Sequence, residues 1–273
     1  MNAWPPLAVS VAAIGLAIAA LVSNGGGASA ILQRAVSVTA RQESYRFLFD
    51  QTAGARGQTV SGIKMQGTYD RSVNLSRLTL GFGGRAGLNE CTVIASDDFW
   101  YVQIPENLRA ANQGRSWIKT DPFLSSPAQG LTSSTLRNES LVDPQAVDDV
   151  RRNGTESIRG VPTTRYRGTF DLAAALARAE TSPLSKEGLE RLQIPGKIPF
   201  SFWIDAQDRI RRTSYSFGIV SGPVTIETKL TYEVYDFGVK ETVTLPTNDE
   251  VAPVSRTAPG LAACLTPSNP LNR

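Results

Sequence analysis

Two neighbouring stretches decide the fold: residues 199–217 read PFSFWIDAQDRIRRTSYSF, and residues 224–235 read VTIETKLTYEVY. In the first, aromatic and β-branched runs at 200–204 and 210–217 flank the polar loop 205–208, which has the length that closes an antiparallel hairpin. In the second, apolar and polar residues alternate with period two, which is typical of a strand with one dry face and one wet face. Together the two stretches predict a β-meander.

The same strand signals recur over most of the chain. Further strands are predicted at 44–51, 60–69, 73–82, 90–95, 99–104, 117–120, 155–158 and 163–170. An antiparallel sheet of this breadth must curl, split or close. We therefore predict an α+β fold with a large curved antiparallel sheet, a half-barrel of about 10–11 strands, wrapped over a few helices.

Helical patterns are few. Apolar spacing predicts a short helix at 31–40, and Pro144 in a first turn predicts another at 143–152 with two valines facing inward. Residues 172–179 and the segment after Pro183 carry short apolar stripes between strands. They are expected to form a lid on the dry face of the sheet, with plain core packing as the alternative.

The composition excludes several kinds of function. The chain of 273 residues contains no histidine, so it cannot build a serine triad, a common zinc-hydrolase site or a His-ligated haem. Its formal charge is only +3, without the concentrated basic face that phosphate binding needs. We expect no enzyme activity, no catalytic residue, no cofactor, no metal and no nucleic-acid partner, although carboxylate, lysine and tyrosine chemistry stays open.

The N-terminus predicts export. Residues 1–30 carry no charged side chain, and Ala28-Ser29-Ala30 has the A-x-A form of a cleavage site. The apolar run of about 16 residues is short for a membrane span, which needs about 20. A signal peptide is predicted. Because no Lys or Arg precedes the run, a true start further upstream or an uncleaved anchor is the alternative. One domain is expected at 31–245, followed by a Pro-rich tail at 246–273.

The two cysteines fit an exported protein. Cys91 lies in a predicted strand and Cys264 in the tail, and an even count in an oxidising compartment suggests a disulfide. By the chain-entropy model, a loop of roughly 170 residues would contribute about 5 kcal/mol. Two independent thiols are the alternative.

The dry face of the predicted sheet is the candidate binding site. Two short helices fill such a breadth poorly, and an underfilled apolar hollow in an exported protein suggests an acyl-chain site. Head groups would meet Arg165, Arg167, Arg211 and Arg212 at its mouth. The expected lining is Phe47, Phe49, Met65, Leu78, Leu80, Val102, Ile104, Phe202, Ile204, Tyr215 and Phe217, with Leu172, Leu176 and Leu192 from the lid.

Three groups of segments resemble the actinobacterial LppX/LprG family of cell-envelope lipoproteins. They are DFWYV at 98–102 with WIK at 117–119; GTESIRGVPTTRY at 154–166; and FSFWID at 200–205 with RIRR at 209–212. The resemblance implies a fold similar to the LolA/LolB lipoprotein carriers, and binding of acylated lipids or glycolipids in the hollow. The family carries a lipobox cysteine at the cleavage site, where this chain has Ala28-Ser29-Ala30-Ile31, so no lipidation is expected.

The expected function is passive lipid carriage in the cell envelope, periplasm or secreted fraction. The partners would be an acylated lipid or glycolipid, a membrane contacted transiently and an envelope lipid exporter, and the chain would be a monomer. The alternative is a non-catalytic structural or partner-binding envelope protein with the same sheet and a filled core.

Overall fold

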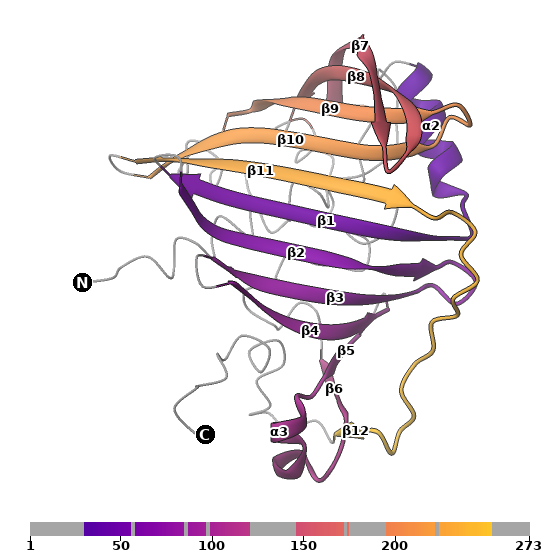
Figure 1. Ribbon diagram of the computed structural model, residues 1–273, viewed down its shortest axis with the longest axis vertical. Helices are drawn as coiled ribbons and strands as arrows, with labels where there is room; N and C mark the ends of the chain where they lie inside the picture. Colours follow the sequence, from indigo (N-terminus) through magenta and orange to yellow (C-terminus); the bar gives the residue numbers. More distant parts are fainter. Residues whose placement is uncertain are drawn as a thin grey trace.

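One broad curved sheet dominates the computed structural model (Figure 1). The structure describes residues 30–55, 58–84, 87–96, 99–120, 146–171, 174, 195–221 and 224–252. Its elements are α2 (Ala30–Ala40), β1 (Ser44–Ala55), β2 (Gln58–Asp70), β3 (Leu75–Gly84), β4 (Gly87–Ala95), β5 (Trp100–Gln103), α3 (Glu106–Arg109), a 3₁₀ turn η1 (Ala110–Asn112), β6 (Trp117–Thr120), β7 (Val147–Ile158), β8 (Val161–Asp171), β9 (Lys197–Asp205), β10 (Ile210–Ser221), β11 (Val224–Tyr235) and β12 (Val251–Ala252).

The twelve strands form a single sheet in the order β12-β6-β5-β4-β3-β2-β1-β11-β10-β9-β8-β7. Neighbours are antiparallel except β12 and β6, which are parallel. The predicted meander is confirmed as β9, β10 and β11, and the predicted fold class is confirmed with it. The twelfth strand lies past the predicted domain boundary at 245, so residues 251–252 of the expected tail belong to the sheet.

The two halves of the chain meet where β1 pairs with β11. Phe47 lies opposite Val234 and Phe49 opposite Tyr232, so strands nearly two hundred positions apart in sequence share one register. Side chains alternate between the faces of a sheet, and this register therefore aligns the apolar residues of both halves on one face. We call the face on which α2 packs the inner face, and the opposite one the outer face.

The predicted helix at 31–40 is confirmed as α2, whereas the one at 143–152 is wrong: β7 begins at Val147. The register between β7 and β8 shifts between Asp148 and Arg151. Such a bulge inserts an extra residue, so Val147 and Val150 approach the same neighbour, Gly168, at a spacing that mimics a helix turn.

Other predictions lie outside the described residues. These are the lid segments with Leu172, Leu176 and Leu192, the signal segment apart from Ala30, and the tail beyond Ala252.

The segment 236–252 crosses the outer face on its way to β12. The backbone N–H of Gly238 donates to the Ser44 carbonyl, and the Thr68 hydroxyl donates to Glu241. Val243 then packs in an outer apolar cluster with Trp117. These contacts attach the C-terminal part of the described chain across the N-terminal strands.

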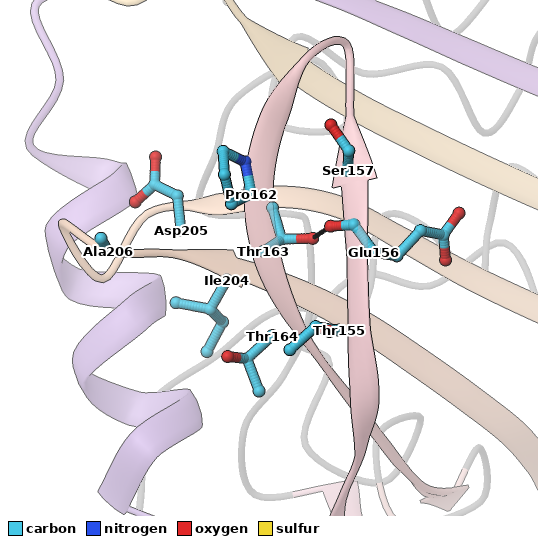
Figure 2. A pocket seen from close by; sticks show the side chains of 9 residues that line it. All are labelled: Thr155, Glu156, Ser157, Pro162, Thr163, Thr164, Ile204, Asp205 and Ala206. Carbon is cyan, nitrogen blue, oxygen red and sulfur yellow. Dashed lines mark hydrogen bonds between the residues drawn. The ribbon is translucent and has the colours of Figure 1, made fainter.

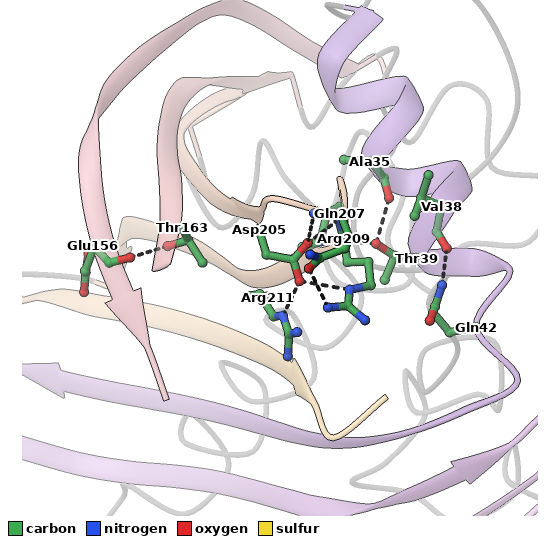
Figure 3. A network of polar contacts seen from close by, with 11 residues as sticks. Ala35, Val38, Thr39, Gln42, Glu156, Thr163, Asp205, Gln207, Arg209 and Arg211 are labelled. Atoms are coloured by element: carbon green, nitrogen blue, oxygen red, sulfur yellow. Dashed lines mark hydrogen bonds and ion pairs between the residues drawn. The ribbon is translucent and has the colours of Figure 1, made fainter. Parts of the chain in front are cut away.

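A buried carboxylate organises the β9–β10 turn (Figure 3). The Asp205 side chain is 0% exposed and accepts backbone N–H bonds from Gln207 and Arg209. It also accepts from the guanidinium groups of Arg209 at 2.9 Å and Arg211 at 2.7 Å. Burial alone would raise the pKa of Asp205, but the hydrogen bonds from Arg209 and Arg211 outweigh it and hold that pKa below its ordinary value.

The same turn anchors α2. Thr39 of α2 accepts a hydrogen bond from the Ile210 backbone N–H at 2.8 Å and donates to the Ala35 carbonyl at 2.7 Å. Arg34 forms an ion pair with Asp208 at the tip of the turn. The helix is thus fixed to the end of the β9–β10 hairpin by buried and exposed polar contacts together.

The substitution Asp205→Asn should lower the free energy of unfolding by about 3–5 kcal/mol at neutral pH, because one partner of a buried ion pair is removed. The carboxylate's contribution is present above the unfolded-state pKa and is lost as pH falls through the depressed folded pKa, below the ordinary 3.8. Urea unfolding of Asp205→Asn and wild type should therefore differ most at neutral pH and converge in strong acid.

Asp208→Asn is the matched control at the same turn. Its side chain is 40% exposed and its ion pair with Arg34 lies at the surface, so a change of at most about 1 kcal/mol is expected. Equal losses for both variants would contradict the role given to Asp205.

Gly67 marks a close approach between β2 and β3. A Cβ atom at this position would lie 2.7 Å from the Leu78 Cα and closer still to the Arg77 carbonyl oxygen. Real Cβ atoms do not come this close to backbone, so only glycine lets the two strands keep their pairing here.

Gly67→Ala should lower the free energy of unfolding by about 1–3 kcal/mol through overpacking. Gly62→Ala on the same strand is the control, since its nearest contact would be an ordinary 3.4 Å to the Gln51 carbonyl oxygen. Denaturant unfolding of both variants measures the difference, and a Gly67→Ala protein as stable as Gly62→Ala would refute the packing argument.

Candidate functional site

The inner face carries one continuous apolar cluster that draws residues from ten of the twelve strands and from α2. Its members are buried, and their alternation follows the register of the sheet. Predicted lining residues in this cluster are Phe47, Phe49, Met65, Leu78, Leu80, Val102, Phe202, Ile204, Tyr215 and Phe217. Ile104 differs: it is buried with Ile118 and Ala252 in a separate small cluster.

Aromatic rings form two groups within this face. Over β8 to β10, Tyr166 stacks on Phe202 at 5.1 Å and Phe200 lies 4.8 Å from Tyr215. Over β1 and β11, Phe47 stacks on Tyr232 at 6.0 Å. Ring pairs of this kind add to the apolar burial and favour fixed side-chain positions.

In the described part of the chain, α2 is the helix that packs on this cluster, through Leu32, Ala35 and Val36. It lies at one end of β9 and β10 (Figure 1). The described residues of this face are buried, and the hollow on it stays a prediction.

Polar groups interrupt the apolar surface at a few positions. The hydroxyl of Thr228 and the indole N–H of Trp100 are buried, and neither has a hydrogen-bond partner. Burial raises the pKa of Tyr232, whose hydroxyl lies near those of Tyr45 and Tyr69, so this phenol stays neutral at physiological pH. The predicted lining did not include Thr228, Trp100 or Tyr232, although Thr228 and Tyr232 lie on the apolar side of the alternating strand 224–235.

The predicted arginine mouth is corrected by the structure for two of its four members. Arg211 is held inside the Asp205 network, and Arg212 pairs with Glu233 and Glu156 on the outer face. Arg165 lies over the Trp203 ring, opposite it in the β8–β9 register. The guanidinium groups of Arg165, Arg211 and Arg212 thus contact side chains within the sheet. The pattern of basic residues alone could not reveal these carboxylate and aromatic partners.

A pocket of about 450 Å³ opens between the β7–β8 hairpin and the end of β9 (Figure 2). Hydroxyl and apolar side chains line most of it. Figure 2 shows the carboxylates of Asp205 and Glu156 on opposite sides of the pocket, and both are engaged by donors elsewhere. They do not converge as an acid–base pair would.

A second pocket, of about 420 Å³, is lined by residues of β1 to β4, by Tyr235 of β11 and by Glu241, with Arg46 and Arg77 among them. Across the described ranges, no group of three His, Cys, Asp or Glu side chains is placed to hold a metal ion. Within the same residues, no helix is both long and apolar enough for a membrane crossing.

Cys91 lies on the inner face, opposite Leu80 in the β3–β4 register. No cysteine of the described part is free. The pairing of Cys91 with Cys264 stays a prediction, because Cys264 lies outside the described residues.

No protein-family model matches the chain. One curated relative, an uncharacterized 31.2 kDa protein in the rplA-rplJ intergenic region of Streptomyces griseus, is 27% identical over 125 residues. The match covers 41% of this chain and 40% of the relative, so the chain matches less than half the length of that protein.

The chain is similar to three solved structures, and each match covers about four fifths of it. The lipoprotein LppX of Mycobacterium tuberculosis is 14% identical, covering 79% of this chain and 97% of its own, with a TM-score of 0.47. LprF of Mycobacterium bovis is 16% identical over 81% and 99%, with a TM-score of 0.46. A LolA superfamily protein of Nitrosomonas europaea is 11% identical over 82% and 99%, with a TM-score of 0.32. LppX and the LolA superfamily protein bear the names of the group that the sequence resembles.

Proposed function

We propose that this protein is a non-enzymatic carrier that holds the acyl chains of a lipid against the inner face of its sheet. The observation that supports this most is the breadth of the inner apolar cluster, which runs from β5 to β7 across an unclosed sheet. Within the described residues, only the short helix α2 packs on it. An apolar surface of this breadth suits hydrocarbon chains better than a polar substrate.

Hydrocarbon burial supplies enough free energy for carriage without chemistry. Each buried CH₂ contributes about 0.8 kcal/mol, so a chain of about a dozen carbons reaches about 10 kcal/mol before ordering costs. The cargo class is an acylated lipid or glycolipid. The proposed setting is the cell envelope after export, with transient membrane contact, an envelope lipid exporter as partner and a monomeric carrier.

One observation favours a second candidate, a structural or partner-binding protein with a filled core. The residues of the inner cluster are almost completely buried by the chain itself, as in an ordinary interior. The two functions differ in one physical property, which is whether the inner face has room for additional side-chain volume.

Ala53→Phe tests for that room, because Ala53 is a small buried member of the inner cluster. In a carrier, the larger side chain should occupy the hollow, weaken uptake of a fluorescent fatty-acyl probe at least about tenfold and leave stability unchanged. In a filled core, it should lower the free energy of unfolding by about 1–3 kcal/mol. Probe titration and denaturant unfolding are measured on the same preparation.

Thr52→Phe is the matched control, since Thr52 is the exposed neighbour on the outer face. It should change neither probe uptake nor stability. Native mass spectrometry of protein purified from its host, followed by solvent extraction, should also show an acylated species bound near one-to-one. A clean apoprotein that takes up no probe would refute the carrier function and support the filled core.

The cysteine pairing is tested by thiol counting. Denatured, unreduced protein should take up no thiol reagent, and reduction should release two reactive thiols, Cys91 and Cys264. Reduction should also lower the free energy of unfolding, by about 5 kcal/mol at most in the chain-entropy model. Two reactive thiols before reduction would contradict the bridge.

A further inference from the structure

Three arginine side chains lie together on the outer face at the β7 edge of the sheet, where β7, β8 and β9 run side by side (Figure 1). Arg165 and Arg167 alternate along β8 with Tyr166, which packs on the inner cluster, so both belong to the outer face. Arg151 of β7 lies directly opposite Arg167 and shares that face. The formal charge of +3 predicted no concentrated basic face, yet the β7–β8 register forms a small one here.

No carboxylate neutralises these three guanidinium groups. Within the described residues, none of the three forms an ion pair. Two carboxylates on β7 are engaged elsewhere: Asp148 pairs with Lys197 at 3.2 Å, and Glu156 pairs with Arg212 at 3.3 Å. Like charges directly opposite each other destabilise a strand pair, so strand pairing alone does not account for two opposed arginines.

Arg165 is positioned by an aromatic neighbour. Its guanidinium carbon lies 5.0 Å from the centre of the Trp203 ring, and the Trp203 indole N–H donates to Glu156 at 2.8 Å, which fixes that ring. Arg165 is half-buried, while Arg151 and Arg167 are exposed, so a ligand can reach all three from solvent. A guanidinium group that is already held in place loses less conformational freedom when it binds.

Hydroxyl groups continue the row beside Arg167. Ser201 of β9 lies opposite Arg167, and Ser214 of β10 lies opposite Ser201. Both serines are partly exposed, and a serine hydroxyl can donate to the same acceptor as a neighbouring guanidinium group. The row therefore presents hydrogen-bond donors beside the uncompensated positive charge.

We propose that Arg151, Arg165 and Arg167 bind a phosphate-type oxyanion on the outer face. A planar guanidinium group binds two phosphate oxygens at once, and a bound anion would offset the repulsion between Arg151 and Arg167. Three such groups suit a single phosphate, because a nucleic-acid backbone needs a longer basic track. Free phosphate and the phosphate of a lipid head group share this chemistry, and the test separates them. The site lies on the face opposite the proposed acyl-binding surface and does not depend on the carrier function.

The test measures both sources with the full chain. Isothermal titration calorimetry follows binding of inorganic phosphate, and co-sedimentation follows binding to vesicles of phosphatidylcholine alone or mixed equally with phosphatidylglycerol. Arg167→Gln should weaken binding of phosphate, of the phosphatidylglycerol vesicles or of both at least about tenfold, because a charged hydrogen-bonding group is lost.

Arg152→Gln is the matched control. Arg152 follows Arg151 in the chain and is exposed like it, but it lies opposite Tyr166 and so belongs to the other face. The control should bind as wild type does. An equal loss of binding in Arg152→Gln would overturn the site, since the effect would then come from net charge.

Arg151→Gln adds a measurement of stability. It should weaken binding as Arg167→Gln does, without lowering the urea midpoint of the ligand-free protein, because it removes a contact between like charges. A fall in that midpoint would show that the opposed arginines stabilise the strand pair, which would overturn the argument for a ligand.

The remaining outcomes identify the source of the phosphate. Loss of phosphate binding alone in Arg167→Gln identifies a free phosphate, loss of vesicle binding alone a lipid head group, and loss of both a phosphate group in either setting. Wild type that binds neither overturns the site. Uptake of the acyl probe should be the same in Arg167→Gln and wild type, so failure of the carrier function and failure of this site are distinguishable.

Discussion

The pairing of β1 with β11 is the constraint on which the rest of the structure depends. It joins Phe47 to Val234 and Phe49 to Tyr232, so a large loop must close before any of these contacts form. The entropy of that closure is offset by apolar burial, including the stacked rings of Phe47 and Tyr232. A shift of one residue would turn every apolar side chain of one half to the outer face, which makes the register as important as the pairing itself.

Local features of the sequence predicted much of this arrangement. Alternation at 224–235 and the polar loop at 205–208 define strand faces and a turn through contacts between near neighbours, and both agree with the structure. The prediction of a helix at 143–152 was wrong because a bulge in β7 gives Val147 and Val150 the spacing of a helix turn. Periodicity cannot distinguish the two cases, since the difference lies in the partner strand.

Non-local partners were the part that the sequence could not supply. Arg211 and Arg212 were predicted at the mouth of the hollow, yet Arg211 binds the buried Asp205 across the turn, and Arg212 pairs with Glu233 of the adjacent β11 and with Glu156 of β7. In the same way, β12 is two residues inside a Pro-rich segment and forms a strand only because β6 offers an edge. For the candidate site, the strand faces were predictable, but the unpaired state of Thr228 and Trp100 required coordinates.

The two edges of the sheet are poorly suited to pairing with another strand. β12 is only two residues long, while β7 is bulged and largely exposed, and short or bulged edges are poor templates for adding another strand. The outer face is crossed by 236–252 and by ion pairs among its strands. The inner face carries the largest buried apolar cluster of the described chain. Its members come from strands of both halves of the chain, so the register that joins β1 to β11 also builds this cluster.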